Sequence, residues 1–234
     1  MSIPIFIGYD YRERAATNVL IDSLYQNSSV PISITPLITS QLVKKGFYFR
    51  KKDPKQSTEF SFTRFLVPHL MNYKGWAIFM DCDMLCFEDI NKLWEKRDDK
   101  YAVMCVKHEH IPSEKTKFQG EIQSQYPKKN WSSLMLFNCE KCKKLTINYV
   151  NSATGLELHR FFWLSSEDKI GELDKSWNFL IGVSDNNDYY ENTENLSLVH
   201  WTLGGPWFKE QRFMGGRLAA NWFASRDNSM KLWD

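Results

Sequence analysis

The stretch W-A-I-F-M-D-C-D-M-L, residues 76–85, carries the clearest structural signal in this chain. Its first five residues, Trp76 to Met80, are apolar without alternation, which is typical of a strand buried on both faces of a parallel sheet. Asp81 and Asp83 follow at once. Because side chains alternate along an extended chain, both carboxylates point to one side and Cys82 points to the other. Ligands of open α/β sheets bind outside the carboxyl ends of the strands, so the stretch predicts a ligand site here.

The segments around this stretch alternate between strand and helix patterns. Ile3 to Ile7 predicts a buried strand, apolar residues recur at helical spacing from Ala16 to Leu24, and Ile32 to Ile38 predicts a second strand. These three segments form a βαβ unit. Further strands are expected at residues 101–106 and 133–137, and helices are expected after a cap at Ser57 or Thr58 and from near Asp89, Glu140 and Leu156. The predicted fold class is α/β with a mostly parallel central sheet.

Composition and charge narrow the class of protein. The 234 residues are 43% hydrophobic and 25% charged, which favours one globular domain over residues 1–234. The formal net charge of +2 argues against a nucleic-acid-binding protein or a polybasic membrane-surface protein. No apolar run approaches the ~18 residues of a transmembrane segment, and the start MSIPIFIGYD lacks the pattern of a secretion signal. We therefore expect a soluble, cytoplasmic protein whose five cysteines are free thiols.

Asp81 and Asp83 are candidate metal ligands. Two carboxylates at the edge of an apolar core repel each other, and a divalent cation would remove that penalty. Their hard oxygen atoms suit Mg²⁺ or Mn²⁺. A second cluster, L-V-H-W-T-L-G-G-P-W-F at residues 198–208, contains His200, whose imidazole would favour Mn²⁺. A solvated turn at Asp81 and Asp83, and a purely structural His200, are the alternatives.

The chain lacks the glycine-rich loops that commonly bind phosphate groups. Neither G-x-x-x-x-G-K-[ST] nor G-x-G-x-x-G occurs in the sequence. A diphosphate bridged by the metal ion remains compatible with the predicted site.

Three segments together resemble a GT-A glycosyltransferase, close to glycosyltransferase family 8. They are Gly8-Tyr9-Asp10 after the first strand, Asp81-Cys82-Asp83, and His200 followed by Gly204-Gly205-Pro206-Trp207. The family carries a D-x-D motif and a late H-x-x-G-x-x-K-P-W motif. The resemblance implies transfer of a sugar from a nucleotide-sugar donor, usually a UDP-sugar, to a hydroxyl of a carbohydrate or glycoconjugate acceptor. It also implies a metal cofactor, Mn²⁺ or alternatively Mg²⁺, held by Asp81, Asp83 and His200.

The resemblance also implies a role for several other residues. Nucleotide contacts are expected from Gly8, Tyr9, Asp10, Arg64, Asp81 and Cys82, with Tyr9 able to stack on a base and Arg64 able to pair with a motif aspartate or a phosphate. The donor sugar is expected to contact Lys129, Asn130, Trp131, Ser132 and Ser133. Glu167 and Asp168 are the candidate catalytic groups on the acceptor side. A buttressing salt bridge at Arg64, a plain turn at residues 129–133 and a solvated acidic turn at residues 167–168 are the corresponding structural alternatives.

The late motif departs from the family pattern. One residue fewer separates His200 from Pro206, and the lysine expected before Pro206 is missing. Lys209, Arg212 or the amides of Gly204 and Gly205 are candidates to bind the diphosphate in its place. Trp207 is the expected anchor of a loop that closes over the diphosphate.

The sequence leaves other readings open. Whether the anomeric configuration is retained or inverted does not follow from these motifs. A phosphatase or phosphotransferase of the haloacid dehalogenase type, with Asp81 as nucleophile, is the alternative enzyme. A sugar-binding protein without catalysis is the alternative outside enzymes.

Overall fold

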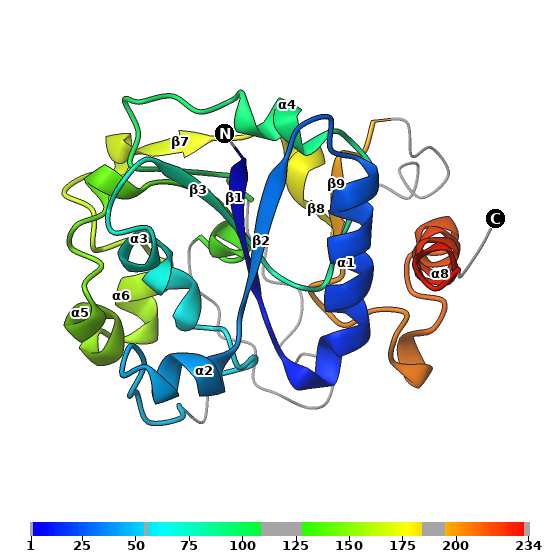
Figure 1. The fold of residues 1–234 in the computed structure, drawn as a ribbon, viewed down its shortest axis with the longest axis horizontal. Helices are drawn as coiled ribbons and strands as arrows, with labels where there is room; N and C mark the ends of the chain where they lie inside the picture. The colour runs from blue at the N-terminus through cyan, green and yellow to red at the C-terminus, as the bar shows by residue number, and fades with distance from the viewer. Residues whose placement is uncertain (1, 54–55, 109–127, 184–194, 232–234) are drawn as a thin grey trace.

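A computed structural model of the chain describes residues 2–53, 56–108, 128–183 and 195–231. Its centre is a six-stranded sheet with the order β2-β1-β3-β6-β5-β7 (Figure 1). Within this sheet only β6 runs opposite to its neighbours, because it pairs antiparallel with both β3 and β5 while the other pairs are parallel. The strands are β1 (Ile3–Gly8), β2 (Ile32–Leu37), β3 (Trp76–Met80), β5 (Val103–Cys105), β6 (Leu134–Asn138) and β7 (Ile170–Glu172). The predicted α/β class and mostly parallel sheet are confirmed.

The predicted βαβ unit forms one edge of this sheet. β1 and β2 pair in parallel from Ile3 opposite Ile32 to Gly8 opposite Leu37. The helix α1 (Arg14–Gln26) connects them and buries the residues spaced for a helix in the sequence, Ala16, Val19, Leu20, Ser23 and Leu24, together with Thr17. The residues that recur at helical spacing in the sequence therefore form the buried face of α1.

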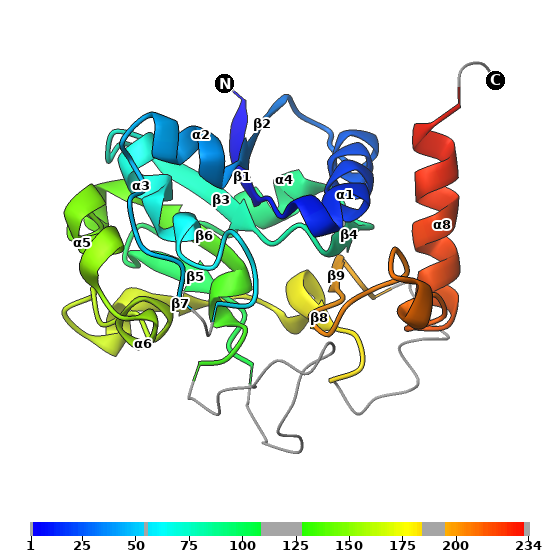
Figure 2. The same cartoon turned by 90° about the horizontal axis from the view of Figure 1, so that it is seen from below.

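A second, three-stranded sheet has the order β4-β9-β8. Its strands are β4 (Met84–Cys86), β8 (Phe179–Leu180) and β9 (Leu198–His200). The last helix, α8 (Arg217–Ser229), stands beside this sheet and α1 (Figure 2). Side chains from α1, β4, β9 and α8, among them Val19, Leu85, Val199 and Trp222, form an apolar cluster separate from the main core. The chain thus has a smaller apolar cluster next to the one around the central sheet.

The remaining helices are short and lie in the connections. They are α2 (Thr39–Lys44), α3 (Val67–Leu70), α4 (Ile90–Trp94), α5 (Ile147–Ser152) and α6 (Gly155–His159). Asp89 caps α4, since its side chain accepts a hydrogen bond from the Asn91 amide. In the described part of the chain, no helix is long and apolar enough to cross a membrane. The five cysteines are buried free thiols, as expected.

Two helix predictions were wrong. Ser57 and Thr58 do not cap a long helix, because the segment divides into a 3₁₀ helix (Thr63–Leu66) and the single turn α3. Pro68 lies in the first turn of α3 and has no amide hydrogen to extend the preceding turns. Near Glu140 the chain makes only a 3₁₀ helix (Cys139–Lys141), and the α-helices begin later, after the capping residues Thr146 and Thr154.

Candidate metal centre

The D-x-D segment joins the two sheets. β3 ends at Met80 and β4 begins at Met84, so residues 81–83 form the link between them. The Asp81 amide donates to the carbonyl of Ser133 at 2.9 Å, and the carbonyl of Asp83 accepts from the Trp201 amide at 2.9 Å. The first aspartate is therefore fixed next to β6 and the second is fixed next to β9.

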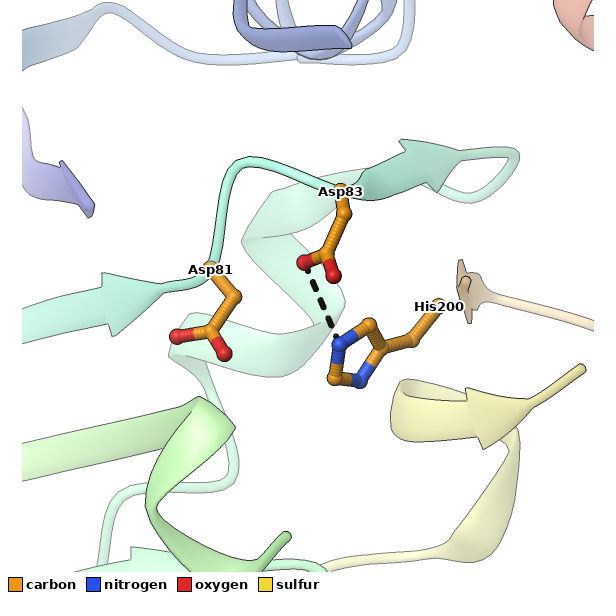
Figure 3. A group of neighbouring side chains, drawn as sticks. All are labelled: Asp81, Asp83 and His200. Atoms are coloured by element: carbon orange, nitrogen blue, oxygen red, sulfur yellow. Dashed lines mark ion pairs between the residues drawn. The ribbon is translucent and has the colours of Figure 1, made fainter. Parts of the chain in front are cut away.

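Asp81, Asp83 and His200 converge in this link (Figure 3). One ligand atom of each residue lies within 4.8 Å of the other two. His200 is brought there by the pairing of β9 with β4, in which it lies opposite Met84. The three residues are buried, with relative exposures of 9% for Asp81, 8% for Asp83 and 1% for His200. Among the residues that the structure describes, this is the one such group of histidine, cysteine or acidic side chains.

Cys82 points away from this group, as the alternation of side chains predicts. Its buried thiol donates to Glu13 Oε2 at 3.5 Å on the side of α1. Burial, together with the negative charges of Asp83, Asp10 and Asp81, raises the pKa of Glu13 to about 8. The Glu13 carboxyl group therefore lies close to those of the three aspartates around the link between the sheets.

Arg64 supplies positive charge on one side of the group. Its Nη1 lies 2.9 Å from Asp81 Oδ1 and also donates to the carbonyl of Ser132 at 2.8 Å. The side chain is buried against the rings of Phe60 and Phe79. Arg64 thus pairs with an aspartate of the motif, which also fits the alternative of a buttressing salt bridge, and its nucleotide contact stays a prediction.

His200 is held between an amide and a carboxylate. Its Nδ1 lies 3.0 Å from Asn178 Oδ1, and its Nε2 lies 3.1 Å from Asp83 Oδ1. Apart from this contact with His200, Asp83 Oδ1 is buried without a hydrogen-bond donor in the described part of the chain. A buried carboxylate oxygen normally has a donor or a cation beside it. Two carboxylates and an imidazole facing one point therefore fit a divalent cation such as Mn²⁺ or Mg²⁺.

The comparisons with known proteins agree with this geometry. A model of glycosyl transferase family 8 matches residues 21–211, a range that contains Asp81, Asp83 and His200. This chain belongs to glycosyl transferase family 8. It is 50% identical over 208 residues to "Protein CDI" of Arabidopsis thaliana, a match that covers 87% of this chain and 79% of that protein. The family membership makes the chain a glycosyltransferase, and the haloacid dehalogenase alternative is not supported.

Solved structures share the GT-A fold of this family 8 enzyme. The galactosyltransferase LgtC, crystallised with donor and acceptor sugar analogues, is 10% identical with a TM-score of 0.58, and the match covers 99% of this chain and 98% of LgtC. The glycosyltransferase GlyE of Streptococcus pneumoniae is 15% identical with a TM-score of 0.61 over the whole of this chain. The chain spans only 61% of the length of GlyE. At these identities the similarity shows the fold.

Three of the residues expected to contact the nucleotide, Gly8, Tyr9 and Asp10, lie at the end of β1, which pairs with β3. Asp10 is fully buried, and its carboxylate accepts hydrogen bonds from the backbone and guanidinium of Arg12 and from the Glu59 amide. Burial acts to raise the pKa of Asp10, but these hydrogen bonds outweigh it and hold the pKa below its usual range. A Cβ on Gly8 would lie 2.3 Å from the Phe60 ring, so Gly8 also has a packing role. Tyr9 between them is half-buried.

The segment expected to contact the donor sugar borders the metal centre. Ser133 bonds to Asp81 through its carbonyl, and the carbonyl of Ser132 accepts from Arg64. Ser132 Oγ lies 2.7 Å from Nδ1 of His159. Asn130 has the left-handed backbone angle φ of 62°, and Lys129 before it is buried. Two of the five predicted sugar residues, Ser132 and Ser133, thus bond directly to Asp81 or to Arg64.

Trp131, in the same segment, contacts His108, a residue that the sequence did not indicate as part of the site. Its indole nitrogen donates to the carbonyl of His108 at 2.9 Å. Burial, together with the nearby His200 and Lys175, lowers the pKa of His108 to about 4. His108 Nε2 is buried without a hydrogen-bond partner in the described residues. Neither His108 nor the neighbouring Lys107 belongs to a motif in the sequence, so nothing there indicated a functional residue.

Glu167 and Asp168 lie in a surface 3₁₀ helix (Glu167–Lys169). Their side chains are 73% and 66% exposed. Glu167 pairs with Lys128, and Asp168 pairs with Lys169 at 3.0 Å and bonds to Ser166. Neither residue belongs to the Asp81, Asp83 and His200 group. Their catalytic role in the family 8 enzyme stays a prediction.

The loop after His200 is already packed in the structure. Gly204 has the positive φ of 99° that favours glycine, and a Cβ on Gly205 would lie 2.4 Å from the Trp207 ring. That ring packs edge-on against Trp201 at 6.1 Å and also contacts Trp222 of α8. Lys209, by contrast, is exposed. The predicted closing movement of this loop stays a prediction, and the packing of Trp207 gives the loop a structural role as well.

Proposed function

We propose that this glycosyltransferase transfers a sugar from a nucleotide-sugar donor, most simply a UDP-sugar, to a hydroxyl of a carbohydrate or glycoconjugate acceptor. We propose further that the transfer depends on a divalent cation, Mn²⁺ in preference to Mg²⁺. The observation that carries the proposal is the convergence of Asp81, Asp83 and His200, buried, at the link between the two sheets.

Asp81, Asp83 and His200 would hold the cation at the carboxyl end of β3. A cation bound there supplies Lewis-acid stabilisation of the negative charge that develops on the leaving diphosphate. Arg64 keeps Asp81 in place through its ion pair, and it also fixes the adjacent Ser132 carbonyl. The same guanidinium therefore connects the metal centre to the proposed sugar segment.

The donor would lie across the ends of β1, β3 and β6. Gly8, Tyr9 and Asp10 at the end of β1 are proposed to contact the base and ribose, with Tyr9 as the stacking group because the Asp10 carboxylate already has its hydrogen-bond donors. Lys129 to Ser133, just before β6, are proposed to contact the sugar. In this proposal the diphosphate would lie between them, at the metal centre.

The diphosphate is proposed to contact Gly204, Gly205, Trp207 and Lys209 on the opposite side. These residues follow His200 in the chain, so the loop begins at a ligand of the metal centre. Backbone amides can replace the missing family lysine as anion-binding groups. Gly204 has the positive φ of 99° that favours glycine, but its amide donates to the Trp201 carbonyl at 2.9 Å, so it would have to leave that bond to bind a phosphate.

A panel of nucleotide sugars tests the proposal. Mn²⁺-dependent binding and slow hydrolysis of one donor are the expected result, and the variant Asp83→Ala should lose both. Asp98→Ala is the matched control, because Asp98 is exposed and pairs only with Lys100 among the described charges. If Asp83→Ala bound UDP and Mn²⁺ as well as the parent protein, the metal centre would be assigned to the wrong residues. A covalent phosphoryl group or beryllofluoride adduct on Asp81 would instead favour the phosphotransferase alternative.

A further inference from the structure

We infer that Asn178, oriented by Ser133, is a positioning residue that fixes which nitrogen of the His200 ring carries hydrogen. The inference rests on the proposed metal centre, and it extends that proposal to a residue outside it. Asn178 is fully buried at the end of a 3₁₀ helix (Lys175–Asn178), 22 residues before His200 in the chain. Its amide lies between His200 on one side and Ser133 on the other.

The surroundings of Asn178 Nδ2 determine how the amide group is turned. Nδ2 lies 2.9 Å from Ser133 Oγ and 3.5 Å from the carbonyl of Asn130. Ser133 Oγ donates its own hydrogen to that same carbonyl at 2.6 Å. The hydroxyl therefore presents a lone pair to Asn178, and the carbonyl can only accept. Both neighbours require the donating end of the amide, so the oxygen of Asn178 must face His200.

The orientation of Asn178 in turn determines the state of the His200 ring. Asn178 Oδ1 can only accept, and it lies 3.0 Å from Nδ1, so Nδ1 must carry a hydrogen. In the neutral ring Nε2 then holds a lone pair, and this nitrogen faces Asp83 Oδ1 at 3.1 Å. Two acceptors this close repel each other, and a cation bound by both would turn the repulsion into coordination.

The opposite orientation of Asn178 would block the metal centre. With the amide turned over, Nδ1 would accept from Nδ2 and the ring hydrogen would lie on Nε2. That hydrogen would point at Asp83, and Nε2 could not serve as a ligand. Ser133 and Asn130 disfavour this state, since the amide oxygen would then face the Asn130 carbonyl. The buried chain from Asn130 through Ser133 and Asn178 to His200 thus selects the ligating form of the ring.

The test combines Mn²⁺ affinity of the protein without nucleotide with nitrogen NMR of the histidine rings. The parent protein should show hydrogen on Nδ1 of His200 at mildly alkaline pH, assigned by comparison with His200→Gln. Asn178→Leu, which keeps the approximate shape, should lose that preference and bind Mn²⁺ about 10- to 100-fold more weakly. Ser133→Ala should cause a smaller change in the same direction, which keeps the inference testable if Asn178→Leu folds poorly. Asn178→Asp retains an oxygen that accepts from Nδ1 and should keep the hydrogen on that nitrogen, although its second oxygen would lie where Nδ2 faces the Asn130 carbonyl.

Asn151→Leu is the matched control. Asn151 is another amide with several hydrogen bonds, to Phe49, Phe47 and Ile147, and it lies on α5. This variant should leave Mn²⁺ affinity unchanged even if it lowers stability. A His200 ring with hydrogen on Nε2 in the parent, or an unchanged ring state in Asn178→Leu, would overturn the inference. Failure of the proposed function would look different, because the parent would then bind no Mn²⁺ while the ring state still responded to Asn178.

Discussion

Asp10 and Asp83 are buried aspartates that follow the neighbouring strands β1 and β3, but their surroundings differ. Asp10, after β1, accepts two hydrogen bonds on each carboxylate oxygen, from Arg12 and Glu59. Asp83, two residues after Asp81, has an Oδ1 that among the described residues contacts only the ring of His200. Hydrogen-bond donors of the protein surround the first carboxylate, whereas the second is the one proposed to bind a cation. Burial alone therefore does not mark a ligand site, and the supply of hydrogen-bond donors distinguishes the two cases.

The largest difference between the two residues should appear in metal binding. Asp83→Asn keeps the shape of the side chain and removes its charge, so Mn²⁺ affinity should fall by about 100-fold or more, roughly 2.7 kcal/mol. The free energy of unfolding should not decrease, because one of several mutually repelling carboxylates has been removed. Calorimetric titration with Mn²⁺ and urea unfolding check the two parts. A large loss of stability with intact Mn²⁺ affinity would place Asp83 with Asp10 as a structural residue.

The reverse pattern is expected for Asp10. Asp10→Asn removes the charge from a carboxylate that orders Arg12 and Glu59, and the free energy of unfolding should fall by about 2 kcal/mol, discounted for the partly exposed Arg12. Mn²⁺ affinity should change by less than about threefold, since Asp10 is not among the converging ligands. Urea unfolding and Mn²⁺ titration of the same sample measure both quantities. If Asp10→Asn weakened Mn²⁺ binding as well as stability, Asp10 could no longer be distinguished from Asp83 as a structural residue.

The contribution of Asp10 should also depend on pH. Its folded pKa is held below the unfolded value of about 3.9, so the stabilisation is present above about pH 4 and is lost as the pH falls through the folded pKa. The stability difference between the parent and Asp10→Asn should therefore be constant near neutral pH and shrink in acid. Unfolding curves from about pH 7 to pH 3 measure it. A difference that grew in acid would mean that the Asp10 carboxyl is stabilising in its protonated form.

The smallest effect is expected at Glu167, an exposed carboxylate that has neither the buried hydrogen bonds of Asp10 nor a place among the converging side chains of the proposed metal centre. Glu167→Gln should change the free energy of unfolding by less than about 0.5 kcal/mol, because the Glu167 side chain is 73% exposed and Lys128 keeps its hydrogen bond to the Arg160 carbonyl. Turnover of the same variant tests its predicted chemistry. A positioned acid or base accounts for about 100-fold or more, so a fall of that size with unchanged nucleotide affinity would support the role. Unchanged turnover would leave Glu167 as part of a surface turn.

The sequence predicted the position of the Asp81 and Asp83 carboxylates because local rules govern it. An apolar run ending in Asp81 and Asp83 specifies a buried strand with two carboxylates on one side, whatever the rest of the chain does. His200 was recognised only through its motif and the resemblance to the family. Asn178 was missed, because a lone asparagine in a short 3₁₀ helix has no periodicity and its importance arises from the pairing of β8 with β9. His108 escaped for a similar reason, since its proximity to His200 joins segments far apart in the chain.

The fold shows the same limit. Periodicity identified β1, β3, β6 and α1 but could not give strand direction, and β6 runs antiparallel to its neighbours. The three-stranded sheet was not foreseen, because its strands contain two or three residues each. Strands that short fall below the length at which alternation can be recognised.

The link at residues 81–83 has a mechanical consequence. Asp81 is tied to the six-stranded sheet through Ser133, and Asp83 is tied to the three-stranded sheet through Trp201. The separation of the two carboxylates therefore depends on how far one sheet slides past the other. A cation coordinated by both carboxylates would link the two sheets, and it would bind only the arrangement in which the two carboxylates are close together. When the cation is bound, the two apolar clusters, each with its own sheet, should therefore unfold in a single cooperative transition.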